Sequence, residues 1–193
     1  MTTGDRDRFP RPVLRGARVV LEPATAAHAP AVERVLRTPQ VARWWPLDGQ
    51  DEVLALCAGD APDLDVWVVE LDGEVVGVIQ AWEEPDPQYR HAGIDLSLHP
   101  SVHGRGLGPE AIRLVARHLF EARGHHRITI DPNARNLAAI RAYVKVGFRP
   151  VGVMRQVEWD ATLGHWTDGV LMDLLRDELT DEPSEPPASA VTA

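Results

Sequence analysis

The chain has 193 residues, of which 44% are hydrophobic and 25% charged, a composition that predicts one compact domain. A net charge of −9 disfavours nucleic acid as a partner, because binding to phosphates needs clustered Lys and Arg, and suits a cationic ligand. No apolar run approaches the ~20 residues of a membrane-spanning helix, and the N-terminus lacks a signal-like apolar segment. We therefore predict a cytoplasmic protein without a membrane partner. The single cysteine, Cys57, excludes an internal disulfide and a thiolate metal cluster.

Residues 1–12 and 180–193 are poor in side chains that can pack, which predicts a flexible N-terminus, a folded domain over 13–179 and a disordered tail. Within the domain, the segment "ARVVLEP" predicts a strand over 17–23. Thr25 is a suitable cap for a helix over about 26–37 that ends before Pro39, and a short helix is expected near 51–58.

Two β-rich runs flank Asp72-Gly73, which predicts a hairpin over 65–84. The next strand alternates, so that Asp95 and Ser97 are expected on a polar face opposite a core face. A helix is predicted from Pro109 to about 122, a strand over 126–132 and a helix over 136–147 that ends at Gly147. Residues 150–159 and 165–175 resemble a closing hairpin. This order predicts an α+β fold, with helices on both faces of one sheet.

Three glycines, Gly104, Gly106 and Gly108, follow the alternating strand and precede a helix. Pro109-Glu110 replaces the Lys-Ser/Thr pair of a P-loop, and the G-x-G-x-G spacing differs from the dinucleotide fingerprint. A turn whose N–H groups converge at a helix N-terminus would instead bind a diphosphate, with Arg105 adding a charge contact. The alternative is an ordinary glycine-rich turn.

The segments "LSLHPSVHGRGLG" and "NLAAIRAYVKVGF" together resemble the acetyl-CoA-binding core of GCN5-related N-acetyltransferases, the GNAT family. The resemblance covers about 14–175 and implies a mixed, mostly antiparallel sheet of about seven strands. It also implies acetyl-CoA as cosubstrate. His103 stands where the family usually has Gln or Arg. The implied coenzyme-binding residues are Leu96, Ser97, Leu98, His103, Gly104, Arg105, Gly106, Leu107, Gly108, Asn136, Ala139 and Tyr143, with Asn136 contacting pantetheine and Tyr143 beside the thiol.

Within this family, "GID" at 93–95, "RWWP" and the Asp131-Pro132 segment resemble aminoglycoside 6′-N-acetyltransferases. The resemblance implies Asp95 as the base and a position for Asp131 near the acceptor. Trp44 and Trp45 would line the acceptor cleft. We also assign Glu83 and Glu84 to this cleft, as an acidic run that suits a cationic amine.

The implied reaction is direct acetyl transfer from acetyl-CoA to a primary amine of a small polycation, foremost the 6′-amine of an aminoglycoside. Backbone N–H groups of residues 96–98, at a bulge usual in the family, would stabilise charge on the thioester oxygen, and Tyr143 would protonate the leaving thiolate. Other segments equally resemble enzymes that acetylate a protein N-terminus, spermidine or a siderophore precursor. A non-catalytic acyl-CoA sensor is the remaining alternative.

Each singled-out residue also has a structural interpretation. On the structural interpretation, Asp95 is a salt-bridge partner, Tyr143 is a core aromatic residue and Asp131 caps a turn. The two tryptophans are otherwise core anchors and the acidic run a solvated surface. The eight histidines lack ligand spacing, so no metal is expected. A monomer and a homodimer are both compatible with the sequence.

Overall fold

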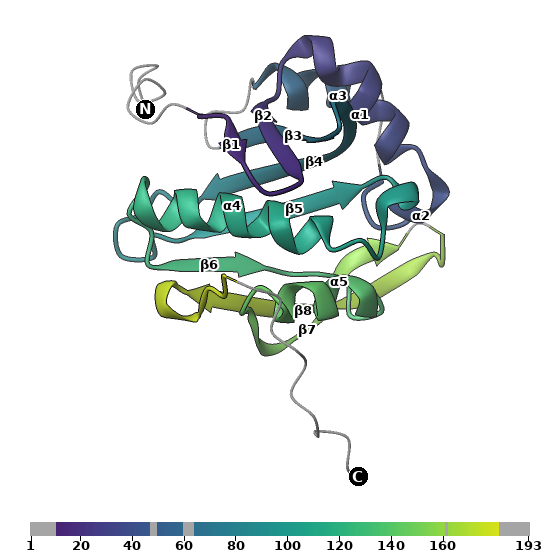
Figure 1. Ribbon diagram of the computed structural model, residues 1–193. Coiled ribbons are helices and arrows are strands. Elements are labelled where there is room, and N and C mark those ends of the chain that lie inside the picture. The colour runs from purple at the N-terminus through teal and green to yellow at the C-terminus, as the bar shows by residue number, and fades with distance from the viewer. Residues whose placement is uncertain (1–10, 47–49, 60–63, 161, 182–193) are drawn as a thin grey trace.

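The computed structural model describes residues 11–46, 50–59, 64–160 and 162–181. One eight-stranded sheet runs through the molecule in the order β1-β2-β3-β4-β5-β6-β8-β7 (Figure 1). All neighbouring strands are antiparallel except β5 and β6, which are parallel. The predicted α+β fold is confirmed. The strands are β1 (Leu14–Arg15), β2 (Val19–Pro23), β3 (Leu64–Leu71), β4 (Glu74–Glu83), β5 (Ala92–Leu98), β6 (Arg127–Ile130), β7 (Arg149–Asp160) and β8 (His165–Leu175).

The sheet contains the seven strands that the sequence predicts and one more, the two-residue β1. β1 pairs with β2 at the edge of the sheet. β3 and β4 form the expected hairpin, and their turn residues Asp72 and Gly73 both have positive φ, 52° and 81°. Two positive φ values indicate the type I′ turn that joins twisted antiparallel strands.

Helices cover both faces of the sheet (Figure 1). α4 (Leu107–Glu121) and α5 (Leu137–Val144) lie on one face, where Ile112, Val115 and Leu119 of α4 enter the larger core. On the other face lie α1 (Ala29–Leu36), α2 (Pro39–Ala42) and α3 (Gln50–Ala58), which enclose a smaller core that contains Cys57. Short 3-10 turns occur as η2 (Ala26–His28), η3 (Pro100–Val102) and η4 (Arg176–Glu178).

The helix expected over 26–37 is divided into η2 and α1. Pro30 occupies the first turn of α1, where its missing N–H costs no hydrogen bond. The sequence analysis did not predict α2. Pro39 begins this single turn, so a residue that was expected only to end one helix also starts the next.

The strand β5 differs from its predicted pattern of one core face and one polar face, because helices cover both faces of the sheet. Gly93, expected on the polar face, is buried, and a Cβ at this position would collide with the indole of Trp82 on β4. The absence of a side chain at Gly93 therefore lets Trp82 lie across β5.

Gly93→Ala should destabilise the fold by about 1–3 kcal/mol, the usual cost of overpacking a core. The measurement is chemical unfolding at equilibrium. Gly152→Ala is the matched control, because Gly152 is also a strand glycine but a Cβ there would meet no atom within 4 Å. Equal stability of the two variants would contradict the collision.

β5 and β6 pair only at Ala92 with Ile128 and Gly93 with Thr129, so the two strands separate from Gly93 onward. On its other side, β5 pairs with β4 in unbroken register from Ala92 to Leu98. The expected bulge in β5 is therefore absent from its pairing with β4. An opening in the sheet on the β6 side exposes the same backbone instead.

The proposed flexible ends fall largely outside the described residues. Where the ends are described, they are bound to the domain. The Pro12 carbonyl accepts a hydrogen bond from the Trp67 indole at 3.0 Å, and Thr180 donates from its N–H to the Val146 carbonyl at 3.0 Å. Asp181 forms an ion pair with Arg117 at 2.6 Å. Thr180 and Asp181 thus contact the folded domain, and the domain bounds stay a prediction.

Candidate active site

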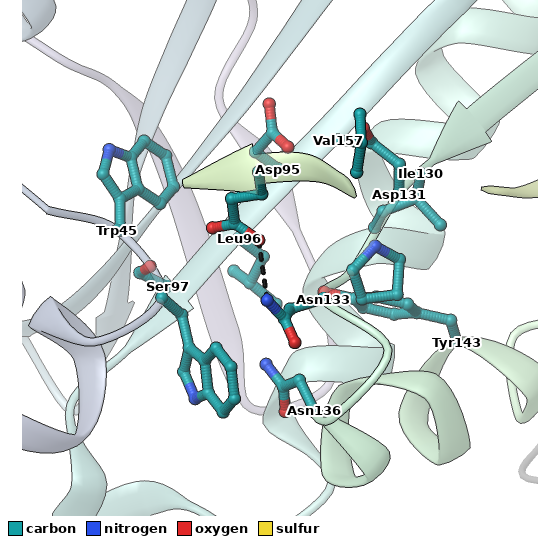
Figure 2. A pocket seen from close by; sticks show the side chains of 13 residues that line it. Trp45, Asp95, Leu96, Ser97, Ile130, Asp131, Asn133, Asn136, Tyr143 and Val157 are labelled. Atoms are coloured by element: carbon teal, nitrogen blue, oxygen red, sulfur yellow. Dashed lines mark hydrogen bonds between the residues drawn. The ribbon is translucent and has the colours of Figure 1, made fainter. Parts of the chain in front are cut away.

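A cavity of about 320 Å³ opens where β5 and β6 separate (Figure 2). It brings together eight of the residues that sequence analysis selected: Trp44, Trp45, Asp95, Leu96, Ser97, Asp131, Asn136 and Tyr143. In Figure 2, Trp45 lies on one side of the cavity, while Asp131 and Tyr143 lie on the other. The lining is completed by Ile130, Pro132, Asn133, Val157 and Glu158, which sequence analysis did not select.

Asp95 is half-buried on β5, where its carboxylate accepts a hydrogen bond from the Gln80 side-chain amide at 3.0 Å. Gln80 lies directly opposite on β4, because the register pairs these two residues. Burial raises the pKa of Asp95, and the Gln80 hydrogen bond only partly opposes that rise. A carboxylate with a raised pKa is a better proton acceptor than an ordinary Asp.

Asp131 follows the end of β6, and Glu158 reaches the same cavity from β7. The pKa of Asp131 is raised by burial of its carboxyl group and then by the negative charges of Asp95 and Glu158. Among the described residues, no Lys, Arg or His side chain lines the cavity. The cavity therefore carries uncompensated negative charge, which favours a cationic ligand.

Tyr143 lies on α5 with only 8% of its surface exposed, and that surface belongs to the cavity. Burial raises the pKa of its phenol, and the charges of Asp95 and Asp131 raise it further. The hydroxyl is therefore protonated throughout the physiological range and can donate a hydrogen bond to a charge that develops beside it.

Trp44 and Trp45 both line the cavity, although an extended loop would turn only one of them inward. The backbone is a turn here, because the N–H groups of both residues donate to the Val41 carbonyl, at 2.8 and 3.0 Å. The guanidinium groups of Arg43 and Arg135 approach the Trp44 ring to 4.2 and 5.8 Å from its centroid. Cation–π attraction thus fixes this wall of the cavity.

The glycine turn lies between β5 and the N-terminus of α4, where Gly104 and Gly106 have φ values of 73° and 79°. Both are exposed, and a Cβ on Gly104 would enter open space. Gly108 lies inside α4 with ordinary φ. Open space in front of a helix N-terminus fits an anion such as a diphosphate. The Leu107 side chain is buried in the core, so only its backbone faces this space.

Two side chains hold the glycine turn in place, one at the start of the turn and one from the N-terminal part of the chain. The His103 ring N–H donates to the Leu98 carbonyl at 2.8 Å, so His103 connects the turn to β5. Arg18, which sequence analysis did not select, donates to the Arg105 carbonyl at 2.6 Å and pairs with Glu110 of α4 at 2.9 Å. Arg105 itself is exposed, and its contact with a coenzyme stays a prediction.

The backbone of β5 offers donors toward the opening. His99 donates its N–H to Val76 of β4, and because N–H directions alternate along a strand, those of Leu96 and Leu98 point away from β4. The bond from His103 to the Leu98 carbonyl lies on that same side. The backbone N–H of Ser97 points toward β4, and the residue is buried.

Asn136 begins α5, and its side-chain oxygen accepts a hydrogen bond from the Ala139 N–H at 3.2 Å. Its amide NH₂ can still donate into the cavity, where Asn136 is among the lining residues. Ala139 packs against the larger core and does not line the cavity. The roles of these two residues toward pantetheine stay predictions.

Glu83 and Glu84 do not line the cavity with Asp95. Glu83 pairs with Ala92 at the far end of the β4–β5 ladder and forms an ion pair with Arg123, and its carboxylate lies 2.9 Å from Nε2 of His125. The Glu84 carboxylate accepts the Asp86 N–H at 3.0 Å. The structure thus places this acidic run in a charged cluster and a turn, and not beside the acceptor cleft.

Three possible metal ligands, Glu22, His28 and Glu70, lie within 4.8 Å of one another outside the cavity. The Thr25 N–H donates to Nδ1 of His28 at 3.1 Å, which places the ring proton of a neutral His28 on Nε2. In that tautomer neither ring nitrogen offers a lone pair to a metal, so this cluster supports no metal site.

The family model described as the acetyltransferase (GNAT) domain matches residues 18–149, more than half of the chain. The chain belongs to the GNAT family. The matched region of this GNAT chain contains the glycine turn, α5 and most of the residues that line the cavity. No described helix has the length and apolarity that crossing a membrane requires.

Curated relatives match this GNAT chain over part of its length. Aminoglycoside N(6′)-acetyltransferase type 1 of Klebsiella pneumoniae is 35% identical over 100 residues, which are 46% of this chain and 49% of the relative. Spermidine N(1)-acetyltransferase of Escherichia coli K12 is 29% identical over 86 residues, 45% and 46% of the two chains. The chain thus spans about half the length of these curated relatives.

Solved structures match over nearly the whole fold. Mycobacterium smegmatis RimJ in complex with CoA-disulfide has a TM-score of 0.76 at 25% identity, covering 89% of this chain and 90% of that one. AAC(6′)-Ib in complex with paromomycin and acetyl-CoA has a TM-score of 0.68 at 24% identity, covering 83% and 95%. The GNAT fold predicted from the two sequence motifs is confirmed.

Proposed function

We propose that this chain transfers an acetyl group from acetyl-CoA to a primary amine of a small polycationic acceptor, foremost the 6′-amine of an aminoglycoside. The observation that carries the proposal is the cavity at the sheet opening, lined by Asp95, Asp131 and Glu158 and by no basic side chain among the described residues. The 35% identity to an aminoglycoside N(6′)-acetyltransferase supports the acceptor class.

Bound acetyl-CoA would supply an activated acetyl thioester. The open turn at Gly104 and Gly106 and the N-terminus of α4 would bind its diphosphate, and Asn136 its pantetheine arm. The N–H groups of Leu96 and Leu98 would donate to the thioester carbonyl oxygen and stabilise the charge that develops there.

An ammonium group cannot attack a thioester, so the site has to bind the cation and then remove a proton. Asp95 attracts the ammonium and accepts its proton, directly or through a water, while Gln80 keeps the carboxylate oriented. Tyr143 donates a hydrogen bond to the departing thiolate sulfur. Because both substrates occupy the site together, transfer is direct and needs no acyl-enzyme.

The likeness to spermidine N(1)-acetyltransferase favours a second candidate acceptor, a linear polyamine. Kanamycin, spermidine and a peptide with a free N-terminus should therefore be compared at a fixed concentration of acetyl-CoA, with release of free thiol as the measurement. We expect turnover with kanamycin to have the highest kcat/KM. Preference for spermidine would change the acceptor class, and turnover with none would refute the proposed function.

Salt should weaken binding of the acceptor, because at 0.1 M ionic strength it screens the attraction between an approaching polycation and the cavity carboxylates beyond a Debye length of ~10 Å. We expect the KM for kanamycin to rise steadily with added NaCl. Glucosamine, which has one amine, is the control acceptor and should show a smaller rise. A KM for kanamycin that does not depend on salt would argue against recognition by carboxylates.

A further inference from the structure

Among the described residues, Glu158 is the one cavity carboxylate that comes from the C-terminal hairpin. It lies on β7 opposite Thr167 of β8, and it is half-buried although most of β7 is exposed. β6 and β8 separate β7 from β5 in the sheet, so Glu158 and Asp95 approach the cavity from different walls. A ligand that contacts both must extend across the cavity.

The Glu158 carboxylate is fixed by a buried amide. Asn133 donates from its NH₂ group to the Glu158 carboxylate at 2.9 Å, the bond drawn dashed in Figure 2, and to the Thr167 hydroxyl at 2.9 Å. Thr167 donates in turn to the Glu158 carbonyl at 3.2 Å, and the Asn133 oxygen accepts the Arg135 N–H at 3.0 Å. Only 6% of Asn133 is exposed. The network therefore holds one carboxylate oxygen, Oε2, and uses no bond to the other, Oε1.

Within the described residues, no cationic side chain is paired with Glu158. The neighbouring Asp160 on β7 does pair with a cation, Arg135. Asp131 experiences the negative charges of both Asp95 and Glu158. A half-buried carboxylate that shares its cavity with two others is unfavourable without a counter-ion, so a ligand that brings a positive charge to Glu158 gains more than it would from an exposed carboxylate.

We propose that Glu158 is a specificity-determining residue that binds a second ammonium group of the acceptor, one that is not acetylated, and that Asn133 is its positioning residue. This inference rests on the proposed function and narrows it. The acceptor class is amines with at least two ammonium groups, of which one reaches Asp95 while another reaches the β7 wall.

The test compares Glu158→Gln with the parent enzyme on two acceptors, neamine, which has several amines, and 6-amino-6-deoxyglucose, which has one. Gln keeps the shape and can still accept the Asn133 hydrogen bond, so only the charge is removed. We expect the KM for neamine to rise roughly 10- to 100-fold, the value of a hydrogen bond to a charged group. The kcat for neamine and the KM for the monoamine should change little.

Glu121→Gln is the matched control, because Glu121 is exposed at the end of α4, does not line the cavity and loses the same charge. It should leave both KM values unchanged. Equal rises in KM for neamine and the monoamine, or no rise for either, would overturn the role of Glu158 while the proposed function stands. A parent enzyme that acetylates neither acceptor would refute the proposed function and this inference together.

Asn133→Ala tests the positioning role. Losing the Asn133 amide removes the hydrogen bond that orients the Glu158 carboxylate, so the KM for neamine should rise while kcat is retained. In the double variant Asn133→Ala/Glu158→Gln, the KM for neamine should be little higher than in Glu158→Gln alone. A purely structural role would instead lower thermal stability and kcat for both acceptors alike. Additive effects of the two substitutions on KM would show that Asn133 does not act through Glu158.

Discussion

Asp95→Asn is expected to lower kcat/KM by roughly 10²–10⁴-fold, the range for loss of a group that transfers a proton. The substitution keeps the shape of the side chain and a carbonyl oxygen for the Gln80 hydrogen bond, but it removes the charge. The affinity for CoA should be unchanged, because the proposed coenzyme contacts come from other residues. Initial rates and calorimetric titration with CoA are the two measurements.

The pH dependence follows from the direction of the pKa shift. Asp95, as the proposed base, has to be deprotonated to accept a proton, so kcat/KM should fall as the pH falls through its raised pKa, above the usual range for Asp. The folded state also binds this proton more tightly than the unfolded state, so the ionised carboxylate costs stability at neutral pH. At pH 7 the Asn variant should therefore melt at the parent temperature or higher, and the difference should vanish below the ordinary Asp pKa.

Asp177→Asn is the control for these measurements, since Asp177 is exposed on η4 and does not line the cavity. It should leave both rate and melting temperature unchanged. If the Asp95 variant retained full turnover, the base would have to be Asp131 or an ordered water. If it lost its fold, Asp95 would be a structural residue.

Gly104→Ala is expected to raise the Kd for CoA roughly 10- to 100-fold, because a methyl group would occupy the space proposed for the diphosphate and displace hydrogen bonds to a charged ligand. The Kd for pantetheine, which lacks the diphosphate, should change little. Gly104 is preferred to Gly106, since a Cβ on Gly106 would also press on Arg18, at 3.3 Å. Titration calorimetry measures both ligands.

Gly124→Ala separates backbone strain from ligand contact. Gly124 has a φ of 68°, close to the 73° of Gly104, and its Cβ would likewise meet no atom within 4 Å. Both variants bear the same cost of a left-handed alanine, about 1–2 kcal/mol. Only Gly104→Ala should weaken CoA binding. Equal losses for CoA and pantetheine would indicate a folding defect and contradict the diphosphate cradle.

Local sequence patterns were enough to predict the β3–β4 hairpin, the strand β5 and the helix α5. The hairpin depends on two β-rich runs around Asp72-Gly73, so it requires no knowledge of the tertiary fold. The cap of α5 at Asn136 was not predicted. The resemblance to the GNAT family also assigned Asp95, Asp131 and Tyr143 to one site, and the structure brings all three to one cavity.

Contacts between residues that are far apart in the sequence could not be predicted from local patterns. Glu83 precedes Asp95 closely in sequence but contacts Arg123 and His125, which follow the C-terminal end of α4. Glu158 lies in a strand that is exposed along most of its length, and only the fold shows that its side chain meets Asn133. One signal was available, the Asn133 turn directly after Asp131-Pro132, where polar residues cluster at a strand end.

The contact of Arg18 with Glu110 bears on the order in which the protein can assemble. These residues are 92 positions apart, and together with the Arg105 carbonyl they fix the turn that contains Gly104. The turn therefore cannot reach its final shape by local folding alone. A chain emerging from the ribosome must be made as far as α4, past all of β1 to β5, before Arg18 can close this contact. With the turn as the proposed diphosphate site, coenzyme affinity becomes a reporter of whether the N-terminal edge of the sheet has docked.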